Sequence, residues 1–146
     1  MKTTIIKHTA LAIFLLLTVG LVGCGDEENE TKTPSEMLIG RWKLVKVGET
    51  KAEIPYYLTL KANGISIREY YDSDKKNMIT ETRNYTQSTE WVYDDELKRF
   101  NAFIQIDVTT YSCHLKNKEM VLDPVYPSFM PIQENYWREY YIKVKE

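Results

Sequence analysis

A succession of short β-patterned segments separated by turn residues restricts the possible folds of this chain most strongly. Phe100 to Val108 shows the pattern clearly, because apolar side chains alternate with polar ones and only Phe103 departs from the alternation. A period of two places one face of a strand in a core and the other face nearer to water. Asn63-Gly64 is a strong hairpin signal between two further segments. Similar segments span residues 42–47, 56–61, 65–71, 78–86, 89–93, 110–115, 119–122 and 136–144.

Only one helix is predicted, and it is short. Thr33-Pro34-Ser35-Glu36 has the pattern of a capping box with proline at the first helical position. Gly40 follows soon afterwards and can end the helix, because glycine is favoured just beyond a helix C-terminus. The chain after it has the pattern of strands, so we expect one all-β domain over residues 34–146.

The order of the segments favours a barrel. Regularly spaced short strands are typical of sandwiches and barrels, and successive hairpins favour an up-and-down arrangement. Closing such a sheet removes its exposed edges. We therefore predict an all-β, antiparallel up-and-down barrel of about eight strands with one short N-terminal helix, which encloses room for side chains or for one small ligand.

The first residues have the layout of a secretory signal. Lys2 and Lys7 precede the apolar stretch Ala10 to Val22, and the small residue Gly23 follows it. A retained transmembrane helix is the alternative, but the unbroken apolar stretch is shorter than the roughly 20 residues that a bilayer needs. We therefore expect residues 1–23 to be removed as a signal peptide.

Leu21-Val22-Gly23-Cys24 ends this stretch and resembles the lipobox of bacterial lipoproteins. The resemblance implies cleavage before Cys24, diacylation of its thiol with chains such as palmitate, and acylation of the new amino group. Two or three acyl chains hold a protein firmly at a membrane, whereas one chain anchors it only marginally. The first expected partner is thus a membrane, through Cys24, and the expected location is the cell envelope, in particular the outer membrane.

Residues 24–33 contain the lipidated cysteine and an acidic stretch. Gly25 to Lys32 has no large apolar side chain to bury, so we predict a flexible tether. Acidic residues just after the lipidated cysteine also resemble the surface-export signals of some outer-membrane lipoproteins. A plain spacer fits the segment equally well, so exposure at the cell surface stays open.

Several function classes lack the residues that they need. The formal net charge is −2 and no basic block stands out, so nucleic acid is not an expected partner. With Cys24 lipidated, Cys113 has no disulfide partner, and His114 beside it points to the opposite face of a strand. We expect Cys113 to be a core residue. A single mature histidine supplies no metal site, and without a catalytic set or a cofactor motif the chain is not predicted to be an enzyme.

Gly40-Arg41-Trp42 opens the first strand after the short helix and resembles the Gly-x-Trp signature of lipocalins. The order of lipobox, acidic tether, Gly-x-Trp-Lys-Leu and an apolar strand into Asn-Gly is similar to that of small lipocalin-like lipoproteins of bacteria. The resemblance implies that Trp42 packs beneath the barrel under an arginine from near the last strand, for which Arg138 is the matching position. A cation over an indole face stabilises by roughly 0.5–2 kcal/mol.

Aromatic residues are the most plausible ligand contacts, with 11 Tyr, 3 Trp and 4 Phe in the chain. Tyrosine joins an apolar ring to a polar tip and so suits cavity walls and interfaces. The adjacent pairs 56–57, 70–71 and 140–141 place one ring on each face of a strand, which leaves open the face that lines a cavity. Tyrosines that fill a small core and coat its outside are the alternative. The candidate ligand-binding side chains are Tyr57, Tyr111, Tyr126, Phe129 and Tyr140.

Residues 123–133 form the other unusual segment, with Pro124, Pro127 and Pro131 among apolar side chains. Proline lacks a backbone donor and blocks regular pairing. Three roles stay open for this segment: a lid over the barrel mouth, a contact for a partner protein, and a strap packed across the barrel.

Together these features predict a membrane-anchored, lipocalin-like barrel that binds a small apolar or amphipathic ligand between its strands and residues 123–133. Binding would rest on burial of apolar area, at about 25 cal/mol per Å² before entropic costs. The alternative is a ligand-free interaction or structural module that contacts another envelope protein or a glycan.

Overall fold

The computed structural model describes residues 32–126 and 137–145. The predicted signal peptide, Cys24, most of the tether and Phe129 lie outside the described residues, as does most of the 123–133 segment. The barrel belongs to a compact unit that spans Thr33–Glu146.

The short helix α2 (Pro34–Leu38) begins at the capping box that the sequence predicts. The Thr33 hydroxyl accepts a hydrogen bond from the Glu36 amide at 3.3 Å, and the Thr33 amide donates to the Glu36 carboxylate at 2.8 Å. These bonds satisfy backbone donors that the start of a helix leaves unpaired. The helix ends where the chain becomes extended at Ile39. In the described part of the chain, no helix has the length and apolar character needed to cross a membrane.

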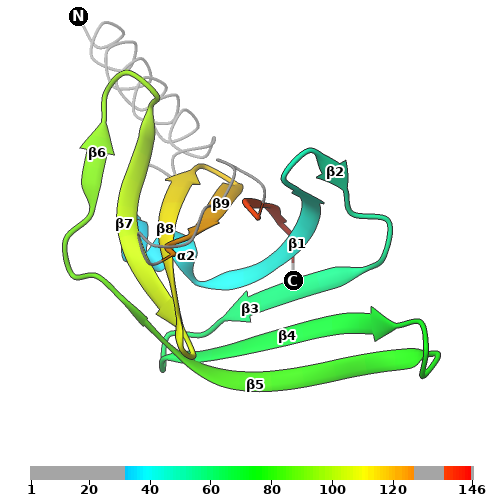
Figure 1. Cartoon of the computed structure of the whole chain (residues 1–146). Coiled ribbons are helices and arrows are strands. Elements are labelled where there is room, and N and C mark those ends of the chain that lie inside the picture. Colours follow the sequence, from blue (N-terminus) through cyan, green and yellow to red (C-terminus); the bar gives the residue numbers. More distant parts are fainter. Residues whose placement is uncertain (1–31, 127–136, 146) are drawn as a thin grey trace, which may run out of the picture. The chain divides into compact units, whose positions relative to one another are not determined.

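The rest of the described chain is mainly β-structure arranged as a closed ring. Its strands are β1 (Gly40–Val47), β2 (Thr50–Lys51), β3 (Tyr56–Leu60), β4 (Ile65–Asp72), β5 (Asn77–Gln87), β6 (Val92–Asp94), β7 (Arg99–Ile106), β8 (Thr109–Lys116), β9 (Glu119–Pro124) and β10 (Glu139–Lys143). Eight of these described strands follow one another in the order β1-β3-β4-β5-β7-β8-β9-β10, and β10 pairs with β1 to close the ring (Figure 1). The pairings are antiparallel. The predicted all-β up-and-down barrel is therefore confirmed.

Two predicted segments differ from the structure at their ends. The alternation predicts a strand as far as Val108, but β7 ends at Ile106 and Val108 is 85% exposed in the turn to β8. Asp107 takes a φ of 54° in this turn. The predicted segment 89–93 is reduced to β6, which begins at Val92 and pairs with β7. An alternating pattern marks the face of a strand, but it does not mark the residue where the partner strand stops.

The hairpin at Asn63-Gly64 is confirmed, with a turn longer than two residues. The Lys61 amide donates to the Ile65 carbonyl at 2.9 Å, and the Gly64 amide donates to the Lys61 carbonyl at 3.2 Å. Within this turn only Gly64 takes a positive φ, 79°. A Cβ added to Gly64 would lie 3.3 Å from the Tyr85 carbonyl oxygen. Glycine fits there because it adopts such a φ without steric cost.

The hydrophobic core lies toward the end of the barrel that α2 covers. Leu38 of α2 and Trp42 of β1 are fully buried in it. Cys113 is confirmed as a core residue, and burial raises the pKa of its thiol to about 12. We call this end the floor, and the opposite end, where β1 ends and β3 begins, the mouth. The other core side chains are Leu58, Leu60, Tyr85, Ile104, Ile106, Tyr111, Leu115, Met120, Leu122 and Tyr141.

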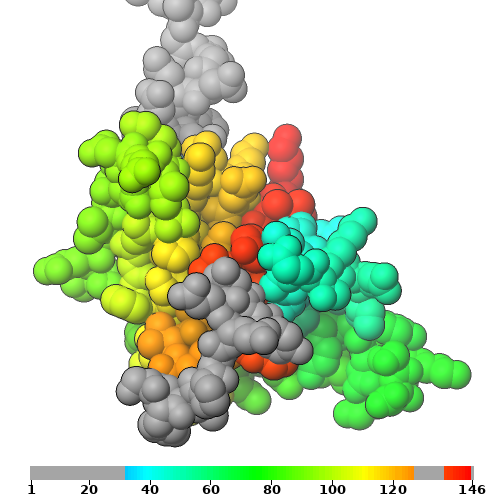
Figure 2. Space-filling model, turned by 45° about the horizontal axis from the view of Figure 1, so that its top comes forward, coloured from blue at the N-terminus to red at the C-terminus, as the bar shows by residue number. Residues whose placement is uncertain are grey.

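The β4–β5 hairpin extends beyond the ring at the mouth. β5 pairs with β4 from Asn77 to Asn84, but it pairs with β7 only from Tyr85 to Gln87. Its first part therefore projects past the turn between β7 and β8. Figure 2 shows the tip of the hairpin, in green, standing out beyond the neighbouring strands. The base of this projection continues the wall of the mouth.

Candidate ligand-binding pocket

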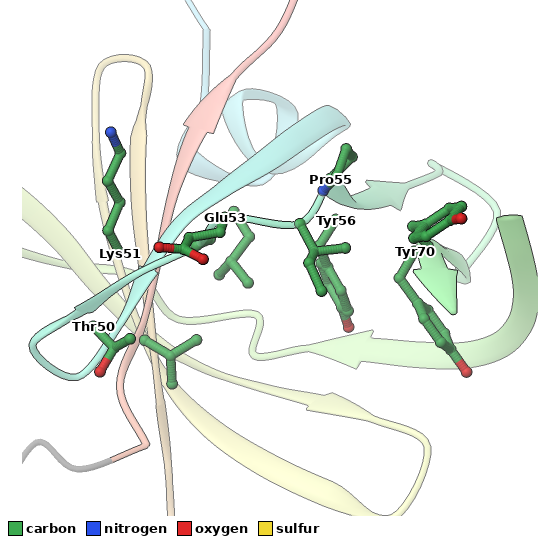
Figure 3. Close-up of a pocket in the computed structure, with 11 residues that line it drawn as sticks. Thr50, Lys51, Glu53, Pro55, Tyr56 and Tyr70 are labelled. Atoms are coloured by element: carbon green, nitrogen blue, oxygen red, sulfur yellow. The ribbon is translucent and has the colours of Figure 1, made fainter. Parts of the chain in front are cut away.

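A pocket of about 540 Å³ opens at the mouth, between the end of β1 and the start of β3 (Figure 3). Its walls are residues 50–56 together with Leu44, Val47, Tyr70 and Tyr71. The lining is mainly apolar and aromatic. Small-molecule sites occupy volumes of about 300–1,000 Å³, so the pocket has the size and the character of such a site.

The wall made by residues 50–56 owes its position to two local features of the chain. The register of β1 against β10 shifts just after Leu44, which is a β-bulge. Gly48 then takes a φ of 56°, in the left-handed region that favours glycine, and turns the chain into β2. The Ala52 amide donates to the Val45 carbonyl at 2.9 Å. This bond holds the segment close to β1, so that it faces β3 and β4 across the pocket.

Two stacked tyrosines form the aromatic wall. Tyr56 and Tyr70 lie opposite each other in the β3–β4 pairing, and their ring centroids are 5.9 Å apart with 19° between the ring planes. Figure 3 shows the two rings along one side of the pocket. The Tyr70 hydroxyl donates to the Glu81 carboxylate at 3.1 Å. Burial raises the pKa of Tyr56 to about 12, so its hydroxyl stays protonated at neutral pH and can donate a hydrogen bond.

Polar side chains cross the barrel interior next to the pocket. Nη2 of Arg68 on β4 donates to the Tyr111 hydroxyl on β8 at 3.2 Å. On β10 the Tyr141 hydroxyl donates to the Glu139 carboxylate at 2.8 Å. Burial raises the pKa of Glu139, while the bond from Tyr141 and the charge of Arg68 oppose the rise. We call Arg68, Tyr111, Glu139 and Tyr141 the polar layer. It adjoins the pocket, because Arg68 lies two residues from the pocket residue Tyr70 on β4, and side chains two residues apart share one face of a strand.

Two of the predicted ligand-binding tyrosines, Tyr111 and Tyr126, lie near the pocket, but neither of them lines it. Tyr111 is 5% exposed and belongs to the polar layer. Tyr126 follows β9 at the mouth and is 38% exposed. Partial burial, with Tyr111 and Glu139 nearby, raises the pKa of Tyr126. Tyr126 lies two residues beyond Pro124, which is opposite Tyr111 in the β8–β9 pairing, whereas Phe129 lies outside the described residues.

Tyr57 and Tyr140 lie on the outer face of the barrel, which corrects their expected place in a cavity. The Arg41 guanidinium carbon is 4.1 Å from the Tyr57 ring centroid, and the Lys46 ammonium is 4.1 Å from the Tyr140 ring centroid. Successive strand residues point to opposite faces, so only one tyrosine of each adjacent pair can face the barrel. Tyr56 and Tyr141 take the inward positions in these two pairs.

The cation that lies over Trp42 at the floor is not the expected one. Trp42 is fully buried, and its Nε1 donates to the Leu38 carbonyl of α2 at 2.9 Å. The cation over the indole is Lys143, whose Nζ lies 5.0 Å from the ring centroid. Arg138 instead donates to Asp123 at 2.6 and 3.1 Å. Lys143 lies directly opposite Trp42 in the β1–β10 pairing, whereas Arg138 precedes β10 at the mouth, so the expected Arg138–Trp42 contact is corrected.

Gly40 has a steric role beside Trp42. Its φ is 135°, and a Cβ at this position would lie 2.7 Å from Cε of Lys143. The Lys143 ammonium also donates to the Met37 carbonyl at 2.5 Å. The missing side chain at Gly40 therefore lets the Lys143 stem reach both the indole and the end of α2.

Sequence reasoning missed the charged members of the polar layer, Arg68 and Glu139. Charged residues are rarely buried, so a charge in a β-patterned segment is assigned to the solvent face. One signal for the pocket was present in the sequence. Tyr56 alternates with Leu58 and Leu60, and a period of two marks all three as one face.

Metal and nucleophile chemistry lack support in the described part of the chain. Within residues 32–126 and 137–145, no group of three or more His, Cys, Asp or Glu side chains is placed to hold a metal ion. His114 lies on the outer face with Nδ1 2.6 Å from Asn101 Oδ1, and burial lowers its pKa. Cys113 faces the core on the other side of the same strand, so the two neighbours do not form a nucleophile–base pair.

A scan against models of known protein families and a search of curated proteins find no match to this chain. The structure shows a closed antiparallel barrel of eight described strands, which is compatible with a lipocalin-like architecture.

Proposed function

We propose that this protein is a lipid-anchored, lipocalin-like barrel of the cell envelope that binds a small amphipathic molecule at its mouth. The observation that carries the binding function is the pocket of about 540 Å³, whose apolar and aromatic wall adjoins the polar layer. Sites for small molecules combine these features, because apolar area supplies binding free energy and a few polar groups fix the orientation. The gain is about 25 cal/mol per Å² of buried apolar area, less the entropic cost of binding.

The binding function is tested by extracting the protein from membranes under native conditions and identifying the small molecules that co-purify by mass spectrometry. Ala52→Trp places a large side chain in the pocket wall, and Ala62→Trp makes the same change in the exposed β3–β4 turn. We expect a bound molecule with the wild type and with Ala62→Trp, and its loss with Ala52→Trp. A bound molecule retained by a folded Ala52→Trp protein would place binding elsewhere, and a wild type without any would refute the function.

The anchor is supported by Leu21-Val22-Gly23-Cys24. Mass spectrometry of the N-terminal peptide from the membrane fraction is expected to show Cys24 as the first residue, carrying acyl chains. Cys24→Ala is expected to lack this modification, whereas Cys113→Ala, a change at the buried core cysteine, keeps it. An unmodified Cys24 in the membrane-bound wild type would contradict the anchor.

A second function, contact with another envelope protein or a glycan, is supported by apolar side chains on the outer face. Val92 of β6 is 65% exposed and Phe103 of β7 is 60% exposed. They share a face, because Val92 lies opposite Asn101, two residues from Phe103. Phe103→Ser is expected to abolish cross-linking to such a partner in intact cells. Unchanged cross-links in the variant would exclude this surface.

A further inference from the structure

Arg68 occupies an unusual place for a cation, on the inner face of the barrel. It lies opposite Leu58 in the β3–β4 pairing and opposite Glu81 in the β4–β5 pairing. Its guanidinium leaves its own strand and meets the Tyr111 hydroxyl on β8. Arg68 is partly buried, and a charge removed from water is unfavourable unless it is paired or hydrogen-bonded. The hydrogen-bond partners of its guanidinium therefore matter.

The protein leaves the Arg68 guanidinium only partly satisfied. A guanidinium carries several N–H donors in a fixed fork. In the described part of the chain, Arg68 makes a hydrogen bond to Tyr111 and no salt bridge, and its Nε is buried without a partner. Arg41 Nε is also buried without a partner, but Arg41 lies on the outer face and its Nη2 pairs with Glu69 at 3.1 Å. Arg68 therefore keeps spare donors inside the barrel.

The surroundings of Arg68 favour a singly charged anion. The Tyr111 hydroxyl accepts from Arg68, so its own proton is available to donate. Glu139 receives a hydrogen bond from Tyr141 and forms no salt bridge with Arg68. Its carboxyl group would repel a second negative charge on a ligand. A carboxylate fits best, because its two oxygens match the planar fork of guanidinium donors.

We propose that Arg68 and Tyr111 bind the carboxylate of the ligand, and that the ligand is an amphipathic organic acid whose apolar body fills the pocket. This inference rests on the proposed binding function and names its ligand class. Tyr70 connects the two parts, because it lines the pocket and lies two residues from Arg68 on the same face of β4.

Three probes that share one straight alkyl chain test this inference: decanoate, decanol and decylamine. Their affinities are measured by titration calorimetry on the full-length protein in phosphatidylcholine nanodiscs, with empty nanodiscs as the blank. A charge-assisted bond from Arg68 predicts that the wild type binds decanoate about tenfold or more tightly than decanol. Arg68→Gln is expected to bind both with equal affinity. Arg83→Gln is the matched control, since Arg83 is 47% exposed and pairs with Asp107, and it should keep the preference.

Tyr111→Phe provides an independent variant if Arg68→Gln does not fold, and we expect it to reduce the preference for decanoate several-fold. Equal affinity of the wild type for decanoate and decanol would overturn the carboxylate subsite while the binding function stands. A preference for decylamine would overturn it in favour of Glu139. A preference that survives in Arg68→Gln would place the carboxylate elsewhere. Binding of none of the three probes would refute the pocket function as well.

Discussion

Replacing Lys143 with methionine retains an unbranched apolar side chain but removes its ammonium group. In the structure this group lies 5.0 Å from the Trp42 ring centroid and donates to the Met37 carbonyl at the end of α2. It therefore connects the helix to the most deeply buried aromatic side chain of the floor. We expect Lys143→Met to lower the free energy of unfolding by about 1–3 kcal/mol.

Two interactions set this magnitude. A hydrogen bond that involves a charged group contributes about 1.5–3 kcal/mol, and a cation over an aromatic face contributes about 0.5–2 kcal/mol. Both involve the same ammonium, so the two terms do not add. Removal of a half-buried charge also relieves part of its desolvation, which offsets some of the loss.

The measurement is urea unfolding of the full-length protein, followed by tryptophan fluorescence, with Arg138→Met as the control. The Arg138–Asp123 pair is solvent-exposed to 29% and 30% of its side-chain areas. Partly exposed ion pairs contribute about 0–1 kcal/mol, so Arg138→Met should have the smaller effect. The resemblance to lipocalins predicts the opposite order, because it assigns the cation over Trp42 to Arg138. An Arg138→Met loss larger than that of Lys143→Met would refute the reasoning from the structure.

Three further predictions concern stability and reactivity. Gly40→Ala should destabilise the barrel by about 1–3 kcal/mol, because its φ of 135° strains an L side chain and the new Cβ meets Lys143; an unchanged urea midpoint would contradict this. The Cys113 thiol should resist iodoacetamide at about pH 8 until the protein is unfolded, since it is buried and its pKa is raised to about 12. Rapid labelling of the folded protein would contradict the burial of Cys113. Burial raises the pKa of Glu139 above 4.5, against the opposing charge of Arg68, so its contribution to stability is full below about pH 4.5 and is lost as the pH rises through the folded-state value. Glu139→Gln should weaken the pH dependence of the urea midpoint above about pH 4.5, and a variant as pH-dependent as the wild type would exclude this origin.

The features that sequence reasoning placed correctly depend on neighbours along the chain. The capping box starts α2 because Thr33 and Glu36 are three residues apart and satisfy each other's backbone amides. The alternation within β7 gives its inward face, and Gly64 gives the position of the β3–β4 turn. Each of these outcomes is decided within a few residues, so the fold class followed from the order of such segments.

The candidate site depended on contacts between distant strands. A period of two separates Tyr56 from Tyr57 but does not say which ring faces inward, since both rings are equally apolar. Closure of the barrel determines which ring faces inward. It also places Lys143 opposite Trp42, through the β1–β10 register.

The Arg68–Tyr111 hydrogen bond is the clearest contact that local sequence patterns could not predict, because Tyr111 comes from a strand on the far side of the ring. Local chemistry specified the strands and their turns. The inward face, the pairing partner and the polar layer arose only when the sheet closed, because closure brings side chains from non-neighbouring strands within bonding distance.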